Sequence, residues 1–88
     1  IIAFDALNGT EKWRNSSFKF RKISELIFIG NNIYFGDLEG YLHKLNAQTG
    51  EIIGQQATEL EEIVQIEARS GRLLAQDSSG SLSAFDLN

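Results

Sequence analysis

Cysteine, proline and methionine are all absent from this sequence of 88 residues. Without cysteine the chain has no disulfide bridge and no thiolate ligand for a structural metal. Histidine occurs once, as His43, so a zinc site made of histidines would lack its other ligands. We therefore expect neither a metal nor a cofactor. A domain of this length buries only roughly 60–65% of the surface of its unfolded chain, so its stability margin is small.

Long apolar runs and positive charge are scarce as well. No run approaches the roughly 20 residues that a membrane helix needs. Residues 1–5 have no basic region and no cleavage pattern, so we do not expect a signal peptide there. They resemble the interior of a strand, and we expect the chain to be a piece of a longer protein. The net charge of −4 argues against nucleic acid as a partner, because phosphate binding depends on a basic surface.

Two local charge patterns stand out. Aromatic and basic residues alternate over 18–22, which can indicate binding of single-stranded nucleic acid. A strand edge or a loop that docks an acidic protein fits this pattern equally well, and we favour that interpretation. The acidic stretch 59–62 is predicted to be a solvated loop, with a partner-docking loop as the alternative.

An internal repeat of about 40 residues predicts the fold. Segment 33–46 aligns with 73–86 without a gap at an offset of 40, and the opening segment aligns with the middle copy at an offset of 41. Residues at turns and in apolar positions recur: Asp37 with Asp77, Gly40 with Gly80, Leu42 with Leu82, and Gly9 with Gly50. Repeats of this length are typical of solenoids and propellers.

Each copy alternates apolar and polar residues, which predicts strands. The strands are expected, in blade order A to D, at 25–29 and 63–68 (A), 32–36 and 72–76 (B), 1–5, 41–46 and 81–86 (C), and 11–15 and 51–56 (D). We predict an all-β fold of four-stranded antiparallel blades, belonging to a larger β-propeller ring of eight blades. The chain would be a C-terminal fragment of that domain: 1–15 supply strands C and D, 24–56 a complete blade, and 63–88 strands A to C of the last blade.

Turn residues separate the expected strands. Asn31 and Asn32, and then Ser70 and Gly71, are predicted to form tight A–B hairpins, where positive φ suits Asn and Gly. An aspartate is expected to cap each B–C turn, which a glycine in the left-handed region closes. The glycines expected to have this structural role in turns are Gly9, Gly40, Gly50 and Gly80.

The first copy resembles the repeat of quinoprotein-type propellers, whose signature is Ala-x-Asp-x-x-Thr-Gly-Lys-x-x-Trp. Ala3, Asp5, Gly9 and Trp13 match it, whereas the middle copy has Gly54 in place of the tryptophan. In that family the tryptophan docks between neighbouring blades. The resemblance therefore implies that Trp13 is a packing anchor between two blades.

A second resemblance is more specific. The string from Gly36 to Leu42, Gly-Asp-Leu-Glu-Gly-Tyr-Leu, and the later pair Gln55-Gln56 are similar to the last blades of the BamB family. These are propeller lipoproteins of the machinery that assembles β-barrel proteins in the outer membrane. The similarity extends from residue 1 to about residue 87. A proline that often begins strand A in the family is missing here, so the loops before strand A are expected to differ.

This resemblance implies a non-catalytic, protein-binding scaffold at the periplasmic face of the cell outer membrane. The implied partners are the periplasmic POTRA domains of BamA and other proteins of the assembly machinery, with unfolded outer-membrane proteins as further candidates. Contact with the membrane would come only from an N-terminal lipid on a cysteine that lies outside this sequence. No partner-contact residue is transferred, because the better-known contact loops of the family precede these blades.

Two other functions remain open at this point. Quinone-dependent dehydrogenases share the propeller superfamily, and a generic interaction propeller would have the same repeat. Asp37 and Glu39 form a possible carboxylate pair, but Asp77 and Ser79 take the same places in the other copy, so an ordinary hairpin is favoured. His43 is predicted to be a solvated or partly packed strand residue, since no nucleophile or orienting acid is expected near it.

Overall fold

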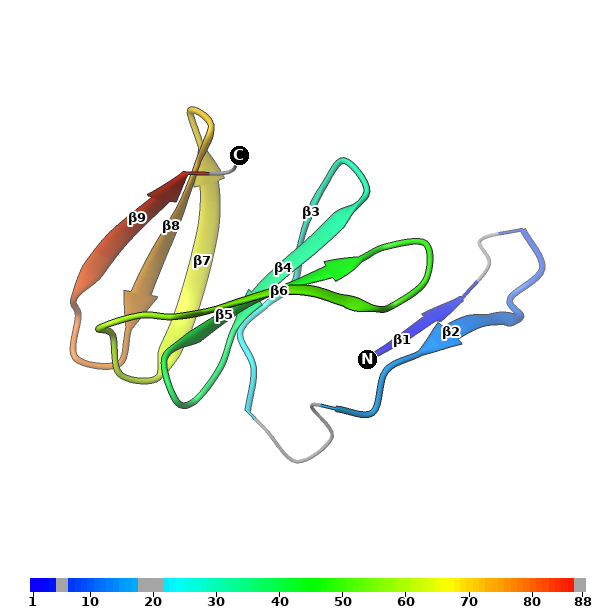
Figure 1. Cartoon of the computed structure of the whole chain (residues 1–88), viewed down its shortest axis with the longest axis horizontal. Coiled ribbons are helices and arrows are strands. Elements are labelled where there is room, and N and C mark those ends of the chain that lie inside the picture. The colour runs from blue at the N-terminus through cyan, green and yellow to red at the C-terminus, as the bar shows by residue number, and fades with distance from the viewer. Residues whose placement is uncertain (5–6, 18–21, 87–88) are drawn as a thin grey trace.

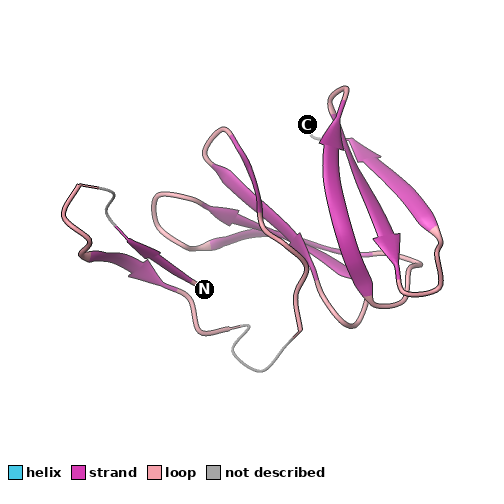
Figure 2. Cartoon of the chain, turned by 180° about the vertical axis from the view of Figure 1, so that it is seen from behind, coloured by secondary structure: helices cyan, strands magenta, loops and turns pink. Residues whose placement is uncertain are grey.

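The structure is a computed structural model that describes residues 1–4, 7–17 and 22–86. These residues form nine strands and no helix (Figures 1 and 2). The strands are β1 (Ile2–Phe4), β2 (Glu11–Arg14), β3 (Ile27–Ile29), β4 (Asn32–Gly36), β5 (Tyr41–Asn46), β6 (Ile52–Ala57), β7 (Ile63–Arg69), β8 (Arg72–Asp77) and β9 (Leu82–Asp86). The predicted all-β class is confirmed. In the described part of the chain there is no helix with the length and apolarity to cross a membrane.

The strands form three separate antiparallel sheets that follow one another along the chain. The first sheet is β1-β2, the middle one β3-β4-β5-β6 and the last one β7-β8-β9. Each strand pairs with its sequence neighbour, so every sheet is a meander. Figure 1 shows the three sheets side by side along the long axis of the molecule, each turned relative to the next.

The strand pairing reproduces the sequence repeat. Ile33 pairs with Leu45 in the middle sheet, and the residues 40 positions later pair in the same way in the last sheet. Ala3 pairs with Trp13, and Lys44 pairs with Gly54 at the equivalent place of the middle sheet. A bulge follows immediately in both cases, after residue 3 and after residue 44. The copies therefore occupy equivalent positions in equivalent sheets.

Three details of the middle sheet differ from the prediction: its first turn, the start of β3, and β6, which spans 52–57 rather than 51–56. The β3–β4 turn consists of Gly30 and Asn31, because Gly30 takes the positive φ of 59° and Asn32 already belongs to β4. Strand β3 begins two residues later than expected. Ser24 explains this: its hydroxyl accepts the Gly36 N–H at 2.9 Å, and its own N–H donates to the Gly36 carbonyl at 2.9 Å. A side chain thus takes a place in the sheet edge that a strand backbone would otherwise fill.

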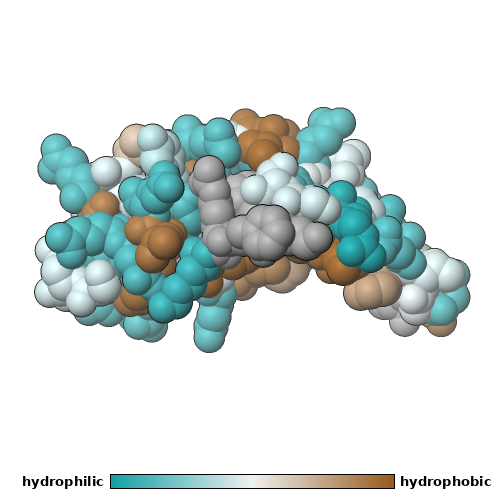
Figure 3. Space-filling view, turned by 90° about the horizontal axis from the view of Figure 1, so that it is seen from below, coloured by the Kyte–Doolittle hydropathy of each residue, from teal (hydrophilic) through white to brown (hydrophobic). Residues whose placement is uncertain are grey.

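The apolar core lies in two seams between neighbouring sheets. The seam between the first and middle sheets contains Trp13, Ile33, Phe35 and Leu45. The seam between the middle and last sheets contains Leu42, Leu60, Ile63, Ile66, Leu73 and Ala75. At Gly36 the middle sheet lies directly against the last one, because an added Cβ would lie 2.2 Å from Cγ2 of Ile63. On the face seen in Figure 3, apolar residues appear as patches separated by hydrophilic ones.

Candidate functional site

Trp13 lies where the first sheet meets the middle sheet. Its side chain is only 9% exposed, and its Nε1–H donates to the carbonyl of Ala47 at 2.8 Å. Ala47 belongs to the β5–β6 turn, and the same turn contains Gly50 with φ of 77°. A Cβ at Gly50 would lie 2.3 Å from Cε3 of the indole, so the ring lies directly on this glycine. The Asn15 side chain adds a hydrogen bond of 2.8 Å to the Gly50 carbonyl.

Gly40, in the β4–β5 turn, contacts the segment that connects the middle sheet to the last sheet. Its φ is 83°, and an added Cβ would lie 2.2 Å from the carbonyl oxygen of Leu60. The Gly40 carbonyl accepts the N–H of Thr58 at 3.0 Å and its hydroxyl at 2.5 Å. The turn and the segment are therefore in backbone contact, which leaves no room for a side chain at residue 40.

The acidic stretch 59–62 is not the plain solvated loop that the sequence predicts. Leu60 is buried in the apolar cluster between the middle and last sheets. The Glu61 N–H donates to Asp77 at 2.9 Å, and the Glu62 carboxylate lies 3.0 Å from Nζ of Lys22. The Lys22 side chain is largely exposed, so this ion pair contributes little stability. One apolar side chain and the backbone, rather than the charges, attach this stretch to the last sheet.

Each B–C turn is capped by a buried aspartate. Oδ1 of Asp37 accepts the backbone N–H groups of Glu39 at 2.9 Å and Tyr41 at 3.0 Å. Oδ1 of Asp77 accepts the N–H groups of Ser79 and Ser81 in the same pattern, at 3.0 and 2.9 Å. Because the pattern is retained where Ser79 replaces Glu39, the aspartates bond the turn backbone rather than form a carboxylate pair.

The prediction for His43 is wrong. Its side chain is 2% exposed, and Nε2 lies 2.6 Å from Oδ2 of Asp37. On the other side of the ring, Nδ1 lies 3.2 Å from Nε2 of Gln55, and the imidazole stacks on Phe35 at 5.0 Å. No acid is expected beside His43 from the sequence, because Asp37 is six residues away in the chain. The tight B–C hairpin brings the second carboxylate oxygen back over strand β5.

The environments of the two aspartates shift their pKa values downward. For Asp37, burial by itself raises the pKa, but hydrogen bonds from His43, Tyr41 and Glu39 outweigh it, and the net pKa is lowered. For Asp77, the hydrogen bond from the Glu61 backbone is the largest cause, and the pKa falls to about 2. Both groups are therefore carboxylates at neutral pH. No buried side-chain nitrogen or oxygen among the described residues lacks a hydrogen-bond partner.

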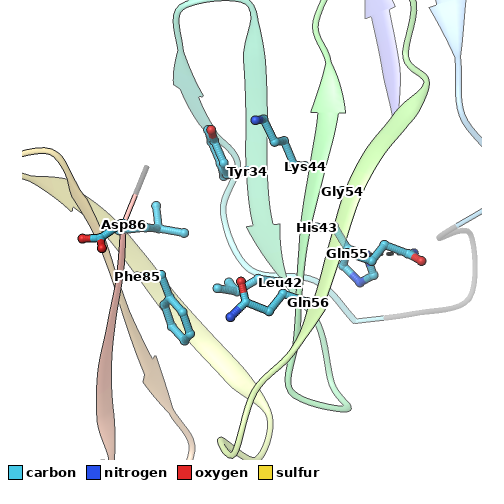
Figure 4. A pocket seen from close by; sticks show the side chains of 10 residues that line it. Tyr34, Leu42, His43, Lys44, Gly54, Gln55, Gln56, Phe85 and Asp86 are labelled. Carbon is cyan, nitrogen blue, oxygen red and sulfur yellow. Dashed lines mark hydrogen bonds between the residues drawn. The ribbon is translucent and has the colours of Figure 1, made fainter. Parts of the chain in front are cut away.

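Two hollows flank strands β5 and β6 of the middle sheet. The first, of about 200 Å³, opens toward the last sheet (Figure 4). Its lining consists of Tyr34, Leu42, His43, Lys44, Gly54, Gln55, Gln56, Leu73, Phe85 and Asp86. The second, of about 250 Å³, is more polar and is lined by Glu39, Tyr41, His43 and Gln55. Neither hollow is expected from the sequence, although Gly54 at the tryptophan position of the repeat is a visible signal for the first.

The remaining predicted residues have simpler surroundings. Gly9 and Gly80 have φ of 73° and 92°, and no heavy atom of the described residues lies within 4 Å of an added Cβ at either one. Most of the aromatic and basic pattern at 18–22 lies outside the described residues, which include only Lys22 of that segment. Within the ranges that the structure describes, no three Asp, Glu or His side chains gather as metal ligands would.

Comparison with known proteins reveals one recurring relative, although no family model matches the sequence. The chain is 30% identical to the outer membrane protein assembly factor BamB of Yersinia pestis, over 97% of this chain and 22% of that protein. It is 28% identical to BamB of Marinobacter adhaerens, over 99% of this chain and 23% of the relative. The chain thus spans less than a quarter of the length of these relatives.

Solved structures agree with the sequence comparison. The crystal structure of BamB from Moraxella catarrhalis matches 97% of this chain and 25% of its own, with a TM-score of 0.85 and 30% identity. The computationally designed Ika4 protein matches with a TM-score of 0.78 at 14% identity, which concerns the fold alone. The predicted propeller blades and the resemblance to BamB are confirmed by these matches.

Proposed function

We propose that this chain, which matches BamB in sequence and fold over nearly its whole length, belongs to an assembly factor for outer-membrane proteins and acts as a binding scaffold without chemistry of its own. The observation that carries the proposal is similarity to BamB in sequence as well as in structure: Moraxella BamB matches 97% of the chain at 30% identity and a TM-score of 0.85. Propeller folds host unrelated functions, so the fold alone would not support this conclusion. The similarity in sequence to several BamB proteins does.

The polar residues of the described part support a scaffold in a second way. The buried polar or charged residues of the described part are Ser24, Asp37, His43 and Asp77, and the Ser24 hydroxyl accepts the Gly36 N–H. Both carboxylates accept backbone N–H groups of their own turns, and the imidazole is stacked and hydrogen-bonded inside the sheet. These groups stabilise hairpins, which present the loops between blades at set positions. A surface of this kind suits recognition of a folded partner.

We further propose a specific partner and a specific cellular location for the whole protein. The resemblance to BamB implies the POTRA domains of BamA as the partner and the periplasmic face of the outer membrane as the place. Other assembly proteins and unfolded outer-membrane proteins are further proposed partners. This proposal applies to the whole protein, of which these blades are one part.

The test uses the whole protein that contains this chain and purified POTRA domains of BamA from the same organism. We expect saturable binding by biolayer interferometry, and a fall in folded outer-membrane β-barrels when the gene is deleted. A generic interaction propeller would leave the barrel level unchanged. Normal barrel levels in the deletion strain, with no POTRA binding, would contradict the proposal. Binding without a change in barrel level would contradict the assembly role alone.

A further inference from the structure

The two seams of the structure differ at a single repeat position. Trp13 in β2 and Gly54 in β6 are equivalent, because each pairs with the residue just before a bulge in the preceding strand. In the first seam the indole lies in a cluster with Ile33 and Leu45 of the middle sheet. The residues 40 positions later, Leu73 and Phe85, line the 200 Å³ pocket beside Gly54. The pocket therefore occupies the place that an indole fills one blade earlier.

The backbone at Gly54 does not itself require glycine. Its φ lies outside the positive region, and an added Cβ would be 3.6 Å from Cβ of Lys44, an ordinary contact. A side chain is thus sterically possible, and its absence is what leaves the pocket open. Glycine inside a strand costs stability and often marks a place where another group approaches closely.

The pocket has the size and lining for an aromatic ring. Its apolar walls come from Leu42 of β5 and Phe85 of β9 (Figure 4). Leu73 of β8 completes them. A cavity of about 150 Å³ with aliphatic and aromatic walls is enough to hold benzene. Lys44 lines the same pocket, and its ammonium already lies 5.8 Å from the centre of the Tyr34 ring. The cation is electrostatically complementary to the negative face of an aromatic ring.

An extended segment can deliver such a ring. Strand β6 is the last strand of its sheet, and its residues at 55–57 are exposed, so among the described strands its outer edge is unpaired. Tyr34, Lys44 and Gly54 form one cross-strand row on the face that looks toward the last sheet. A strand added to β6 would continue this row, and its residue opposite Gly54 would point to the same face. Aromatic side chains opposite glycine are a recurrent way to cover an edge glycine.

We propose that the pocket beside Gly54 binds an aromatic side chain of an extended partner segment that pairs with the outer edge of β6. The backbone of the segment would add a strand to the middle sheet, and its ring would enter the seam against Leu73 and Phe85. Main-chain pairing supplies affinity in such complexes, and the pocket supplies selectivity. The proposal rests on the repeat comparison and not on BamA, so it stands or falls separately from the proposed function.

The test is a titration of the whole protein, with methyl-labelled leucine, by two seven-residue peptides of alternating threonine and valine. One peptide has a central tryptophan and the other a central leucine. We expect the tryptophan peptide to shift the methyl signals of Leu42 and Leu73 upfield in a saturable manner, and the amide signals of β6 to shift with it. The leucine peptide should bind roughly three- to ten-fold more weakly, since an aromatic contact contributes beyond its area.

Two variants locate the site. In Gly54→Trp the chain fills the pocket with its own indole, and we expect at least a ten-fold loss of affinity for the tryptophan peptide. Ala57→Trp is the matched control, because residue 57 points to the opposite face of the same strand and should leave binding unchanged. Equal affinity for both peptides in the unaltered protein, or no methyl shift at Leu73, would overturn the proposal. Undiminished binding by folded Gly54→Trp would overturn it as well.

Discussion

Replacing Trp13 by alanine removes the largest apolar side chain of the seam between the first and middle sheets. A buried tryptophan removes roughly 150–250 Å² from water, which at about 25 cal/mol/Å² corresponds to about 4–6 kcal/mol as an upper limit. The carbonyl of Ala47 also loses its 2.8 Å hydrogen bond from the indole. Substitutions of this kind in protein cores cost about 3–5 kcal/mol, which is our expectation for Trp13→Ala.

The measurement is equilibrium unfolding of the whole protein in urea, followed by circular dichroism because the indole signal is lost in the variant. Trp13→Phe is the control: it retains apolar bulk but not the N–H donor, so its cost should be clearly smaller. The free energy of unfolding should fall, while the slope of that free energy against urea concentration stays the same. An unchanged slope would show that the denatured state is unchanged.

A double-mutant cycle with Gly50 tests the contact itself. Alone, Gly50→Ala places a Cβ 2.3 Å from the indole and also strains a residue with φ of 77°. Without the indole only the backbone strain remains, so the second substitution should cost less in the Trp13→Ala background. We expect a coupling energy of about 1–3 kcal/mol. Additive costs, or a Trp13→Ala variant as stable as the unaltered protein, would refute the role of this residue in the seam.

Four further substitutions, one of them a control, test the hairpins. Gly40→Val should lower the free energy of unfolding in urea by about 2–5 kcal/mol, because the new Cβ meets a backbone carbonyl 2.2 Å away at positive φ. Gly80→Val is the control, because no described atom lies near its Cβ, and it should cost clearly less. Equal costs would contradict the steric argument. His43→Leu should cost about 1.5–3 kcal/mol in the same assay, because it removes a hydrogen bond to the buried Asp37 carboxylate. An unchanged urea midpoint would exclude a contribution of this hydrogen bond to stability. Asp77 has a pKa lowered from 3.8 to about 2, so its stabilisation is present above pH 4 and is lost as the pH falls toward 2. Asp77→Asn should therefore reduce the loss of stability between pH 4 and pH 2 in an acid titration. An unaltered pH profile would contradict the stabilising role of the Asp77 carboxylate.

Much of the fold follows from local patterns. Strands β4 and β5 begin and end where the alternation of apolar and polar residues predicts, and Ser70 and Gly71 form the expected turn with φ of 52° and 75°. Two errors concern the first hairpin of the middle sheet. Ser24 delays the start of β3 by taking a backbone partner, and Gly30 rather than the asparagines adopts positive φ because it has no Cβ.

The candidate sites were less accessible to sequence reasoning. The sequence predicts a solvated or partly packed His43, and it places Leu60 within an acidic stretch predicted to be a solvated loop. Both are buried because of contacts from outside their own strand or loop: the aspartate of the hairpin reaches the imidazole, and the seam covers the leucine. The pocket beside Gly54 could have been anticipated from the missing tryptophan, but its walls come from a sheet whose position only the structure shows.

By itself the sequence determined the strands, most turns and the resemblance to BamB, because a 40-residue repeat and its turn residues record local backbone preferences in every copy. The tertiary structure decided how neighbouring sheets meet: the indole on Gly50, the Leu60 carbonyl on Gly40, and the open space beside Gly54. The physical reason is that seam packing depends on distances between residues far apart in the chain. Alternation along one strand says which side chains share a face, and only the neighbouring sheet determines what that face contacts.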